Sequence, residues 1–249
     1  MGELEPISIV TPSLFPANKV LGGFTTRHGG VSKPPFDSLN LGYGTGDERT
    51  SVSENHERLY RFLGIGAENA AFMDQVHGNS VTVVGSGGTA PASDGLVTSA
   101  KGVLLCVRTA DCIPLLLYDP VHSAAGAVHC GWRPLVSGIA GKAVALMNGL
   151  YGSVPADILA ALGPSAGPCC YEIGNDVADL LDTDSTVERN GSIFGDLRAE
   201  LTGRLAAAGL RPESIETSPD CTVCHEADYF SHRRDGERAG RMAGFILIR

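Results

Sequence analysis

Six short apolar segments between residues 70 and 128 restrict the folds open to this chain more than any other feature. They cover residues 70–73, 80–84, 95–98, 103–107, 113–118 and 124–128. Each segment is short for a helix, and Gly, Asp or Pro residues punctuate the stretches between them. Apolar runs of this length, bounded by turn residues, are typical of buried strands. This region is therefore predicted to form β-sheet.

Two longer segments have the spacing of apolar residues that is typical of helices. Residues 52–63 are predicted to form a helix that begins with a capping box at Ser51 and ends at Gly64. Residues 135–150 have the same periodicity, and Pro134 precedes them, where it would occupy the first helical position. The chain is therefore predicted to contain one helix before and one helix after the strand-rich region in the sequence.

The rest of the chain continues this alternation of strands and helices. Residues 157–162 and 242–248 read as strands, and residues 175–181 and 193–208 as helices. Strands joined by short turns and then interleaved with helices predict the α+β class, with a mixed sheet and helices packed on one side of it. No segment marks a domain boundary, so we expect a single domain that spans residues 1–249.

The charge and the composition exclude several classes of function. A net charge of −9 argues against a nucleic-acid partner, because phosphate backbones require a basic surface. No apolar run approaches the length of about 18 residues that a membrane span needs. The first six residues lack the features of a signal peptide, so the seven cysteines are expected to be reduced thiols in a cytoplasmic protein. A small anionic or neutral substrate is compatible with this composition.

Residues that commonly bind metals lie at the ends of three predicted strands. The first segment, residues 74–78, contains His77, the second, residues 109–112, ends at Cys112, and the third, residues 129–133, begins with His129. A lone His after a strand is usually a structural residue, and a lone Cys between apolar strands is usually a small buried hydrophobe. From the residues alone, a shared metal site and three unrelated structural residues both stay open.

Several motifs in a fixed order make the chain resemble the laccase-domain family. Members of that family have been called multicopper polyphenol oxidases, peptidoglycan editing factors and purine nucleoside phosphorylases. The motifs lie at residues 24–32, 38–42, 74–78, 109–112, 129–133, 162–164 and 171–174. The likeness runs from about residue 20 to the C-terminus. It implies that His77, Cys112 and His129 bind one zinc ion.

This ligand set agrees with the chemistry of zinc. Two imidazoles and one thiolate are suitable zinc ligands, and three protein ligands leave the fourth tetrahedral position open, as in catalytic sites. The helix predicted to begin near Pro134 would direct its free N–H groups toward the loop that holds His129. We therefore expect a phosphate to bind there, assisted by Arg133.

The number of His residues argues against the oxidase activity that the family name suggests. A multicopper oxidase requires a large set of His ligands, several of them in His-x-His pairs, together with a Cys for its blue copper centre. This chain has seven His residues and no His-x-His pair. A copper polyphenol oxidase is therefore not expected, although copper would bind adventitiously in vitro at a site designed for zinc.

Further substrate-binding residues are implied by the resemblance. Arg27 and Asn40 belong to the matching N-terminal motifs, and Arg233 lies in the most basic segment of the chain. These three residues, with Arg133, are predicted to contact the substrate. Asp111 precedes the Cys ligand, and it is predicted either to act in acid–base catalysis or to support that ligand.

The activity implied by the resemblance is that of a zinc-dependent purine nucleoside phosphorylase. It would cleave adenosine, inosine and methylthioadenosine with phosphate, giving the base and ribose 1-phosphate, with Cys112, His77 and Asp111 as catalytic residues. An open metal position for water also offers a route to adenosine deamination. The implied partners are the purine nucleoside and phosphate, with no nucleic acid or membrane, and no protein partner can be inferred.

Two other classes of function stay open. Cys112 could be the nucleophile of a metal-free Cys–His hydrolase, activated by His77 or His129. The chain could also be an editing factor for peptidoglycan precursors, as one name of the family suggests. The hydrolase would use the same residues as the phosphorylase, and the editing factor requires no particular residues. The sequence therefore does not distinguish these alternatives from the phosphorylase.

The remaining cysteines receive no function from the sequence. The segment 221–225 matches the Cys-x-x-Cys-His signature of covalent haem attachment, but that attachment requires export. As half of a zinc site it lacks a second pair of Cys or His residues at the usual spacing. It is therefore interpreted as a loop, and Cys169 and Cys170 as a packed corner.

Overall fold

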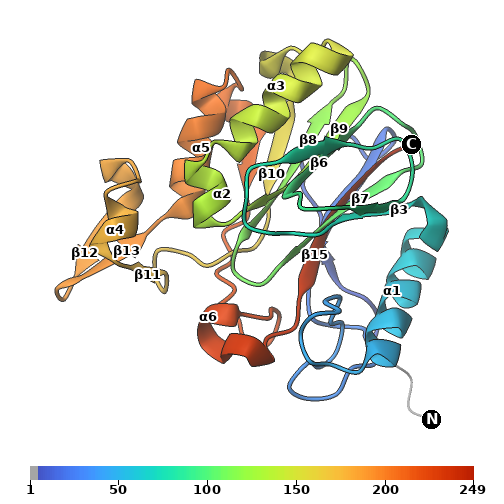
Figure 1. Ribbon diagram of the computed structural model, residues 1–249, viewed down its shortest axis with the longest axis horizontal. Coiled ribbons are helices and arrows are strands. Elements are labelled where there is room, and N and C mark those ends of the chain that lie inside the picture. Colours follow the sequence, from blue (N-terminus) through green and yellow to red (C-terminus); the bar gives the residue numbers. More distant parts are fainter. Residues whose placement is uncertain (1–4) are drawn as a thin grey trace.

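Two six-stranded sheets, packed face to face, form the centre of the molecule in the computed structural model, which describes residues 5–249 (Figure 1). The first sheet has the strand order β1 (Ile9–Val10), β2 (Val20–Thr25), β15 (Met242–Ile248), β7 (Leu104–Thr109), β3 (Ala70–Met73) and β5 (Gly88–Ala90). The second has the order β14 (Ile215–Thr217), β10 (Leu159–Leu162), β8 (Ile113–Asp119), β9 (Ala124–Cys130), β6 (Gly95–Thr98) and β4 (Val81–Val83).

Both sheets are mixed. In the first sheet β3 runs parallel to β5 and β7, and the other neighbours are antiparallel. In the second sheet β10 is parallel to β14 and β4 is parallel to β6, whereas the central strands are antiparallel. The predicted α+β class with mixed sheets is therefore confirmed.

The space between the two sheets is filled by apolar side chains from both. Leu116 of β8 and Ile246 of β15 belong to this core, and both are fully buried. The alternate residues of β8, such as Leu115, face away from the first sheet and contact the helices on the other side. Because both faces of these strands are covered, their sequences are continuously apolar instead of alternating.

Helices cover the outer faces of both sheets. Helix α1 (Arg49–Leu63) packs on the first sheet, where its Leu59 and Tyr60 contact buried residues of that sheet. Helices α2 (Trp132–Val136), α3 (Ile139–Tyr151) and α5 (Leu197–Ala207) pack on the second sheet. The predicted mixed β-sheet layers with helices packed on the sheet are confirmed, but the prediction that the helices lie on one side of one sheet is wrong. Strands that are apolar on both faces can pack against a second sheet as well as against helices, and the sequence pattern does not distinguish the two.

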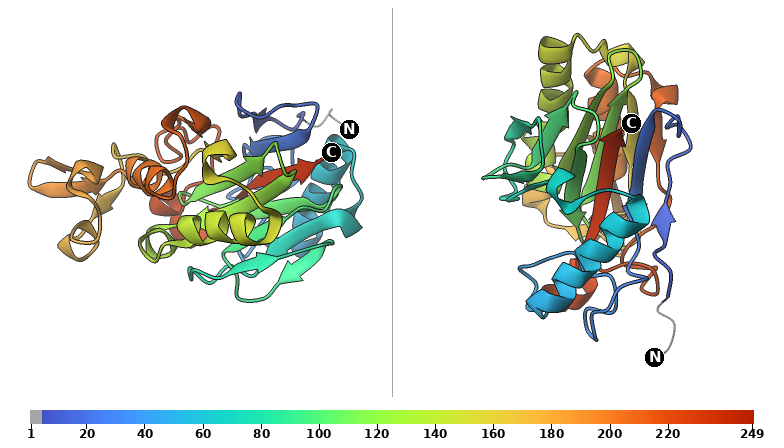
Figure 2. Two further views of the ribbon diagram at one scale, coloured as in Figure 1. Left: turned by 90° about the horizontal axis from the view of Figure 1, so that it is seen from above. Right: turned by 90° about the vertical axis from the view of Figure 1, so that its right-hand side faces the viewer.

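A small third sheet projects from the body of the molecule. It contains β11 (Glu172–Ile173), β13 (Ser192–Gly195) and β12 (Thr186–Arg189), and it carries the short helix α4 (Asn175–Ala178). Figure 2 shows this unit standing away from the two main sheets. The last helix, α6 (His232–Asp235), precedes the final strand. Single 3-10 turns lie at Ala67–Asn69, Pro155–Asp157, Thr183–Ser185, Pro212–Ser214 and Gly236–Arg238.

The strands predicted between residues 70 and 128 are confirmed with small shifts of their ends, but several helix boundaries differ. Helix α1 begins at Arg49, so the predicted capping box at Ser51 is wrong, and the actual N-cap, Glu48, makes no capping bond through its side chain. Gly64 ends the helix as predicted, with a left-handed φ of 70°.

The helix predicted over residues 135–150 is interrupted. It consists of α2 and α3, which are separated at Gly138, whose φ is +79°. Because α2 already begins at Trp132, Pro134 occupies the third helical position and not the first. A glycine in the left-handed region breaks the hydrogen-bond ladder of a helix without disturbing its apolar periodicity. A prediction based on periodicity therefore does not detect the break.

Two further predictions are corrected in the C-terminal half. The residues predicted to begin a helix at Ile193 form strand β13, and helix α5 starts only at Leu197, where the side chain of Asp196 caps it. Helix α4 ends at Ala178, before the predicted end at residue 181. Within the described residues no helix is long and apolar enough to cross a membrane. The first four residues, on which the expectation about a signal peptide partly rests, lie outside the described residues.

Truncation of a side chain between the sheets should destabilise the protein strongly. Leu116→Ala leaves a cavity where both sheets contribute side chains, so we expect a loss of about 2–5 kcal/mol in the free energy of unfolding. Leu150→Ala is the matched control, because Leu150 is 55% exposed, and its cost should stay within about 0.5 kcal/mol. Urea denaturation measures both values. Similar small losses for the two variants would contradict the assigned core.

Candidate metal centre

Three side chains from separate strand ends meet at one end of the two sheets. His77 lies in the turn after β3, Cys112 lies between β7 and β8, and His129 lies near the end of β9. Their ligand atoms lie within 4.8 Å of one another. The register explains part of this proximity, because Pro114 pairs with His129 and the start of β8 is therefore adjacent to the end of β9.

The carboxylate of Asp94 joins the segments that carry the two histidines. Asp94 is fully buried, and its Oδ1 accepts a hydrogen bond from Nδ1 of His129 at 2.8 Å. The same carboxylate accepts the backbone N–H groups of Val76, His77 and Gly78 at distances of 3.2, 3.0 and 2.7 Å. Because an ionised carboxylate can only accept, Nδ1 of His129 carries the proton, and Nε2 is left free to bind a metal.

The turn that presents His77 adopts an uncommon backbone conformation. His77 has a φ of +57°, which few residues other than glycine adopt. Three successive N–H groups of this turn point to the carboxylate of Asp94. These bonds to a buried charge compensate the cost of the left-handed conformation, which is about 1–3 kcal/mol. Asp94 therefore fixes the backbone of one ligand and the ring of another.

The electrostatics of the cluster favour a thiolate. Burial raises the pKa of the Cys112 thiol, but the neighbouring His129 and His77 imidazoles outweigh burial and lower it to about 6. Burial lowers the pKa of His129, whereas the charge of Cys112 and the bond to Asp94 raise it to about 9. For Asp94, burial raises the pKa, but the bonds from His129 and the backbone leave it below its ordinary value. The thiolate is the form of cysteine that binds metals and that acts as a nucleophile.

The residues present fit a zinc ion. One thiolate and two imidazoles are a donor set that zinc prefers, and the carboxylate–histidine pair is a common support for such ligands. Gly131 lies directly beside the ligands. A Cβ atom at Gly131 would lie 2.9 Å from Sγ of Cys112 and 3.6 Å from Cδ2 of His77, so a side chain there would crowd both ligands.

The cluster of His77, Cys112 and His129 lines a cavity of about 610 Å³. Two arginines, Arg108 and Arg241, contribute to its wall, together with His232. Burial lowers the pKa of each guanidinium, but an arginine remains charged because its ordinary pKa is above about 12. The cavity therefore combines three candidate metal ligands with two fixed positive charges, which is suitable for an anion.

A second cavity of about 650 Å³ adjoins the first. Its wall includes the aromatic rings of Tyr43, Tyr60 and Phe72. Tyr43, Asp74 and Arg108 line both cavities, so the two are neighbours. One cavity thus offers charged groups and the other offers rings on which a flat heterocycle can stack.

Two of the predicted substrate residues have their polar groups occupied. Asn40 is fully buried, and its side chain donates to Thr45 and Asp47 and accepts from the N–H groups of Gly42 and Arg241. It therefore positions segments that line the metal cavity instead of facing it. Arg27 donates to Asp37 and to the carbonyl of Glu226, and it lines a separate cavity of about 360 Å³.

The other predicted residues lie near the cluster without lining the metal cavity. The guanidinium of Arg133 stacks on Trp132, with 4.3 Å between its Cζ and the ring centroid. That of Arg233 lies 4.9 Å from the ring centroid of Tyr171. Asp111 accepts from the N–H of Arg233 at 2.6 Å and from Oγ1 of Thr222 at 2.7 Å, so its two oxygens hold neighbouring loops.

The helix expected to provide a phosphate site is shorter than predicted. Helix α2, which follows His129, has five residues, and the chain turns away at Gly138. A helix dipole accumulates over successive aligned peptide units, so a segment of this length carries little of it. The positive groups of the metal cavity are instead the side chains of Arg108 and Arg241.

Sequence reasoning missed Asp94, Arg108 and Arg241. All three lie at or beside strand ends, which is the signal that identified His77 and Cys112. Arg108 lies near the end of β7, Arg241 directly precedes β15, and Asp94 directly precedes β6. Charged residues at these positions could have been found by the same criterion, but their partners come from distant segments.

Loss of the Asp94 charge should weaken metal binding. Asp94→Asn removes the carboxylate that orients His129 and the His77 turn, so we expect the zinc dissociation constant to rise about 10–100-fold. Competition with a chromophoric chelator measures it. Asp119→Asn is the matched control, because Asp119 is equally buried and also accepts from an imidazole, that of His122, and from two backbone N–H groups. Unchanged zinc affinity in Asp94→Asn would contradict this role.

Comparison with known proteins places this geometry in a family. Residues 22–249 match the family model described as multi-copper polyphenol oxidoreductase laccase. The chain is 39% identical to purine nucleoside phosphorylase YlmD of Geobacillus stearothermophilus over 244 residues, which is 91% of this chain and 89% of that protein. It is 34% identical to purine nucleoside phosphorylase YlmD of Bacillus subtilis, with 99% of this chain and 98% of that protein covered.

Solved structures show the same fold. The structure of the hypothetical protein YfiH from Bacillus licheniformis matches with a TM-score of 0.89 and 34% identity, over 92% of this chain and 93% of that one. The structure of YlmD from Geobacillus stearothermophilus matches with a TM-score of 0.88. These matches confirm the resemblance found in the sequence motifs. The chain belongs to the laccase-like family whose model is described as multi-copper polyphenol oxidoreductase laccase and which includes relatives named purine nucleoside phosphorylase.

Proposed function

We propose that this protein is a zinc-dependent purine nucleoside phosphorylase that cleaves adenosine, inosine and methylthioadenosine with phosphate. The observation that carries the proposal is the cavity in which His77, Cys112 and His129 face the same space as Arg108 and Arg241. The names of the relatives support the same class of reaction. The products would be the free base and ribose 1-phosphate, or 5-methylthioribose 1-phosphate when methylthioadenosine is the substrate.

Phosphate would bind in the metal cavity. Arg108 and Arg241 supply charged donors that suit the oxygens of a phosphate. Zinc held by His77, Cys112 and His129 would add positive charge and Lewis acidity at the same place. In a partly buried cavity these charges act more strongly than they would in water.

The purine would bind in the adjoining aromatic cavity. Tyr43, Tyr60 and Phe72 offer faces and edges of rings to a flat base. Asp74 and Arg108 line both cavities, so they would lie beside the ribose that connects the base to the reacting phosphate. The Asp74 carboxylate is suited to accept hydrogen bonds from ribose hydroxyl groups.

The chemistry consists mainly of positioning. A phosphate oxygen attacks the anomeric carbon of the ribose, the bond from that carbon to the purine nitrogen breaks, and the base leaves with the electron pair and takes up a proton. Holding both reactants in adjoining cavities makes this step effectively unimolecular. The two guanidinium groups hold the attacking phosphate, and Asp111, whose oxygens both hold neighbouring loops, positions the segment that carries Cys112.

A Cys–His hydrolase is the second candidate. The observation that favours it is the position of Cys112 beside His129, because a thiolate next to a protonated imidazole is also the activated nucleophile of Cys–His enzymes. The two candidates differ in their need for metal. Full activity of zinc-free protein in the presence of a chelator would support the hydrolase and contradict our proposal.

The decisive assay measures products with and without phosphate. Zinc-loaded protein is incubated with each of the three nucleosides, and chromatography follows the free base, ribose 1-phosphate and inosine. We expect the base and the sugar 1-phosphate, which is 5-methylthioribose 1-phosphate for methylthioadenosine, only when phosphate is present. Deaminase activity would give inosine from adenosine without phosphate. Absence of phosphate-dependent turnover for all three nucleosides would refute the proposed function.

Removal of one positive charge from the metal cavity should impair phosphorolysis. Arg241→Ala should lower kcat/KM by about 10²–10³-fold and raise the KM for phosphate, because a preorganised charged donor is lost. Arg61→Ala is the matched control, since Arg61 is exposed on α1 and lines neither cavity. Steady-state kinetics at varied phosphate concentration measure both variants. Wild-type kinetics in Arg241→Ala would exclude the phosphate site proposed here.

A further inference from the structure

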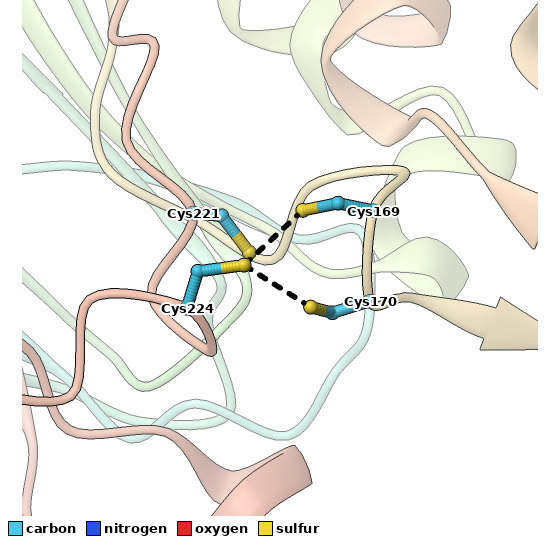
Figure 3. Close-up of side chains that lie close together, drawn as sticks. All are labelled: Cys169, Cys170, Cys221 and Cys224. Atoms are coloured by element: carbon cyan, nitrogen blue, oxygen red, sulfur yellow. Dashed lines mark hydrogen bonds between the residues drawn. The ribbon is translucent and has the colours of Figure 1, made fainter.

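Four cysteines from two distant loops meet at the base of the projecting small sheet (Figure 3). Cys169 and Cys170 lie in the turn between β10 and β11, and Cys221 and Cys224 lie in the loop after β14. The four sulfur atoms lie within 4.8 Å of one another. Sγ of Cys224 is 3.5 Å from Sγ of Cys169 and 3.3 Å from Sγ of Cys170. None of the four lines the metal cavity described above.

These separations suit one metal ion at the centre of the cluster. A zinc–sulfur bond of about 2.3 Å places tetrahedral sulfur ligands about 3.8 Å apart. The observed contacts of 3.3 and 3.5 Å and the limit of 4.8 Å for all pairs lie around that value. A disulfide would use only two of the sulfurs, whereas Cys224 contacts both Cys169 and Cys170. A single tetrahedral ion accounts for the convergence of all four.

The backbone around the cluster directs N–H groups to sulfur. The N–H of Gly167 donates to Sγ of Cys221 at 3.3 Å, and the N–H groups of Val223 and Cys224 point to the same atom. Metal-bound ligands are commonly held by such hydrogen bonds, which also stabilise the thiolate. A Cβ atom at Gly167 would lie 3.4 Å from Sγ of Cys169 and 3.4 Å from Cβ of Cys221, so residue 167 is packed directly against the cluster.

Positive charges surround the two loops. Arg189 donates to the carbonyl groups of Pro168 and Cys169, and Arg234 donates to those of Thr222 and Val223. Arg198 donates to the carbonyl of Asp220 on the other side. Four thiolates around a divalent ion carry a net negative charge, and neighbouring arginines stabilise thiolates. The arrangement of the arginines is therefore consistent with a thiolate-rich site.

We propose that Cys169, Cys170, Cys221 and Cys224 form a second, structural metal site that binds zinc. Four sulfur ligands complete a tetrahedral zinc ion and leave no position for a substrate, which distinguishes a structural site from the open cluster at Cys112. Cys169 and Cys224 are exposed, so a metal ion can reach the sulfurs from solvent.

The position of the cluster defines what the metal would hold together. One pair of ligands begins the projecting sheet, because β11 starts two residues after Cys170. The other pair lies in the loop whose Thr222 donates to Asp111 at 2.7 Å, and Asp111 is adjacent to Cys112. A zinc ion would therefore fasten the projecting sheet to the body and support the loop behind the first metal centre.

Metal content of the full chain tests the proposal. Wild-type protein and the variants Cys112→Ser and Cys224→Ser are purified under reducing conditions, and zinc and iron are quantified by mass spectrometry of the elements. We expect Cys112→Ser to retain a full equivalent of zinc after dialysis against a weak chelator, and Cys224→Ser to lose an equivalent relative to wild type. Cys106→Ala, a buried thiol outside both clusters, is the matched control and should retain the wild-type content.

Cobalt binding identifies the ligands, and this experiment does not require a stable Cys224→Ser variant. Metal-free Cys112→Ser is titrated with Co²⁺ alone, and the intensity of the thiolate-to-cobalt charge-transfer band should be that of four sulfur ligands. A disulfide among the four cysteines in reduced protein, iron in place of zinc, or Cys112→Ser protein without bound metal would overturn the proposal. Because Cys112→Ser removes the first centre, none of these results depends on the proposed phosphorylase activity.

Discussion

The buried carboxylate of Asp94 is the interaction on which the metal centre depends. It accepts one hydrogen bond from the ring of His129 and three from the backbone of residues 76–78. A buried donor that loses its acceptor lowers the free energy of unfolding by about 1–3 kcal/mol. Because four such donors depend on this carboxylate, it is difficult to replace. One charge thereby fixes the position of two ligands that are separated by 52 residues in the chain, from 77 to 129.

The two-sheet architecture brings the remaining groups to the same end of the molecule. Cys112 lies in the connection from β7 in the first sheet to β8 in the second, so it belongs to the seam between the sheets. Arg108 comes from the first sheet and His129 from the second. Because sheets with tightly packed side chains between them are stiff, they hold the strand ends that carry these residues at fixed separations.

The sequence predicted the strands and the meeting of His77, Cys112 and His129, but not the supporting residues. The strands were predictable because apolar runs punctuated by turn residues are a local signal, and the triad because His77, Cys112 and His129 lie in recognisable motifs. The packing of the two sheets against each other and the role of Asp94 depend on contacts between distant segments, which leave no local signal in the sequence. The same holds for the pairing of Cys169 and Cys170 with Cys221 and Cys224, which are about 50 residues away in the chain and have no local signal for one another.

The place of strand β15 has a consequence for how the protein is made. This strand lies between β2 and β7, so it forms the middle of the first sheet although it is the last element of the chain. During synthesis β1 and β2 emerge early and can pair with each other, but the other edge of β2 gains its partner only after residues 242–248 have left the ribosome. Pairing over such sequence separations is slow and leaves strand edges open meanwhile. In a nascent chain of this protein the inner edge of β2 therefore stays open until residues 242–248 have emerged.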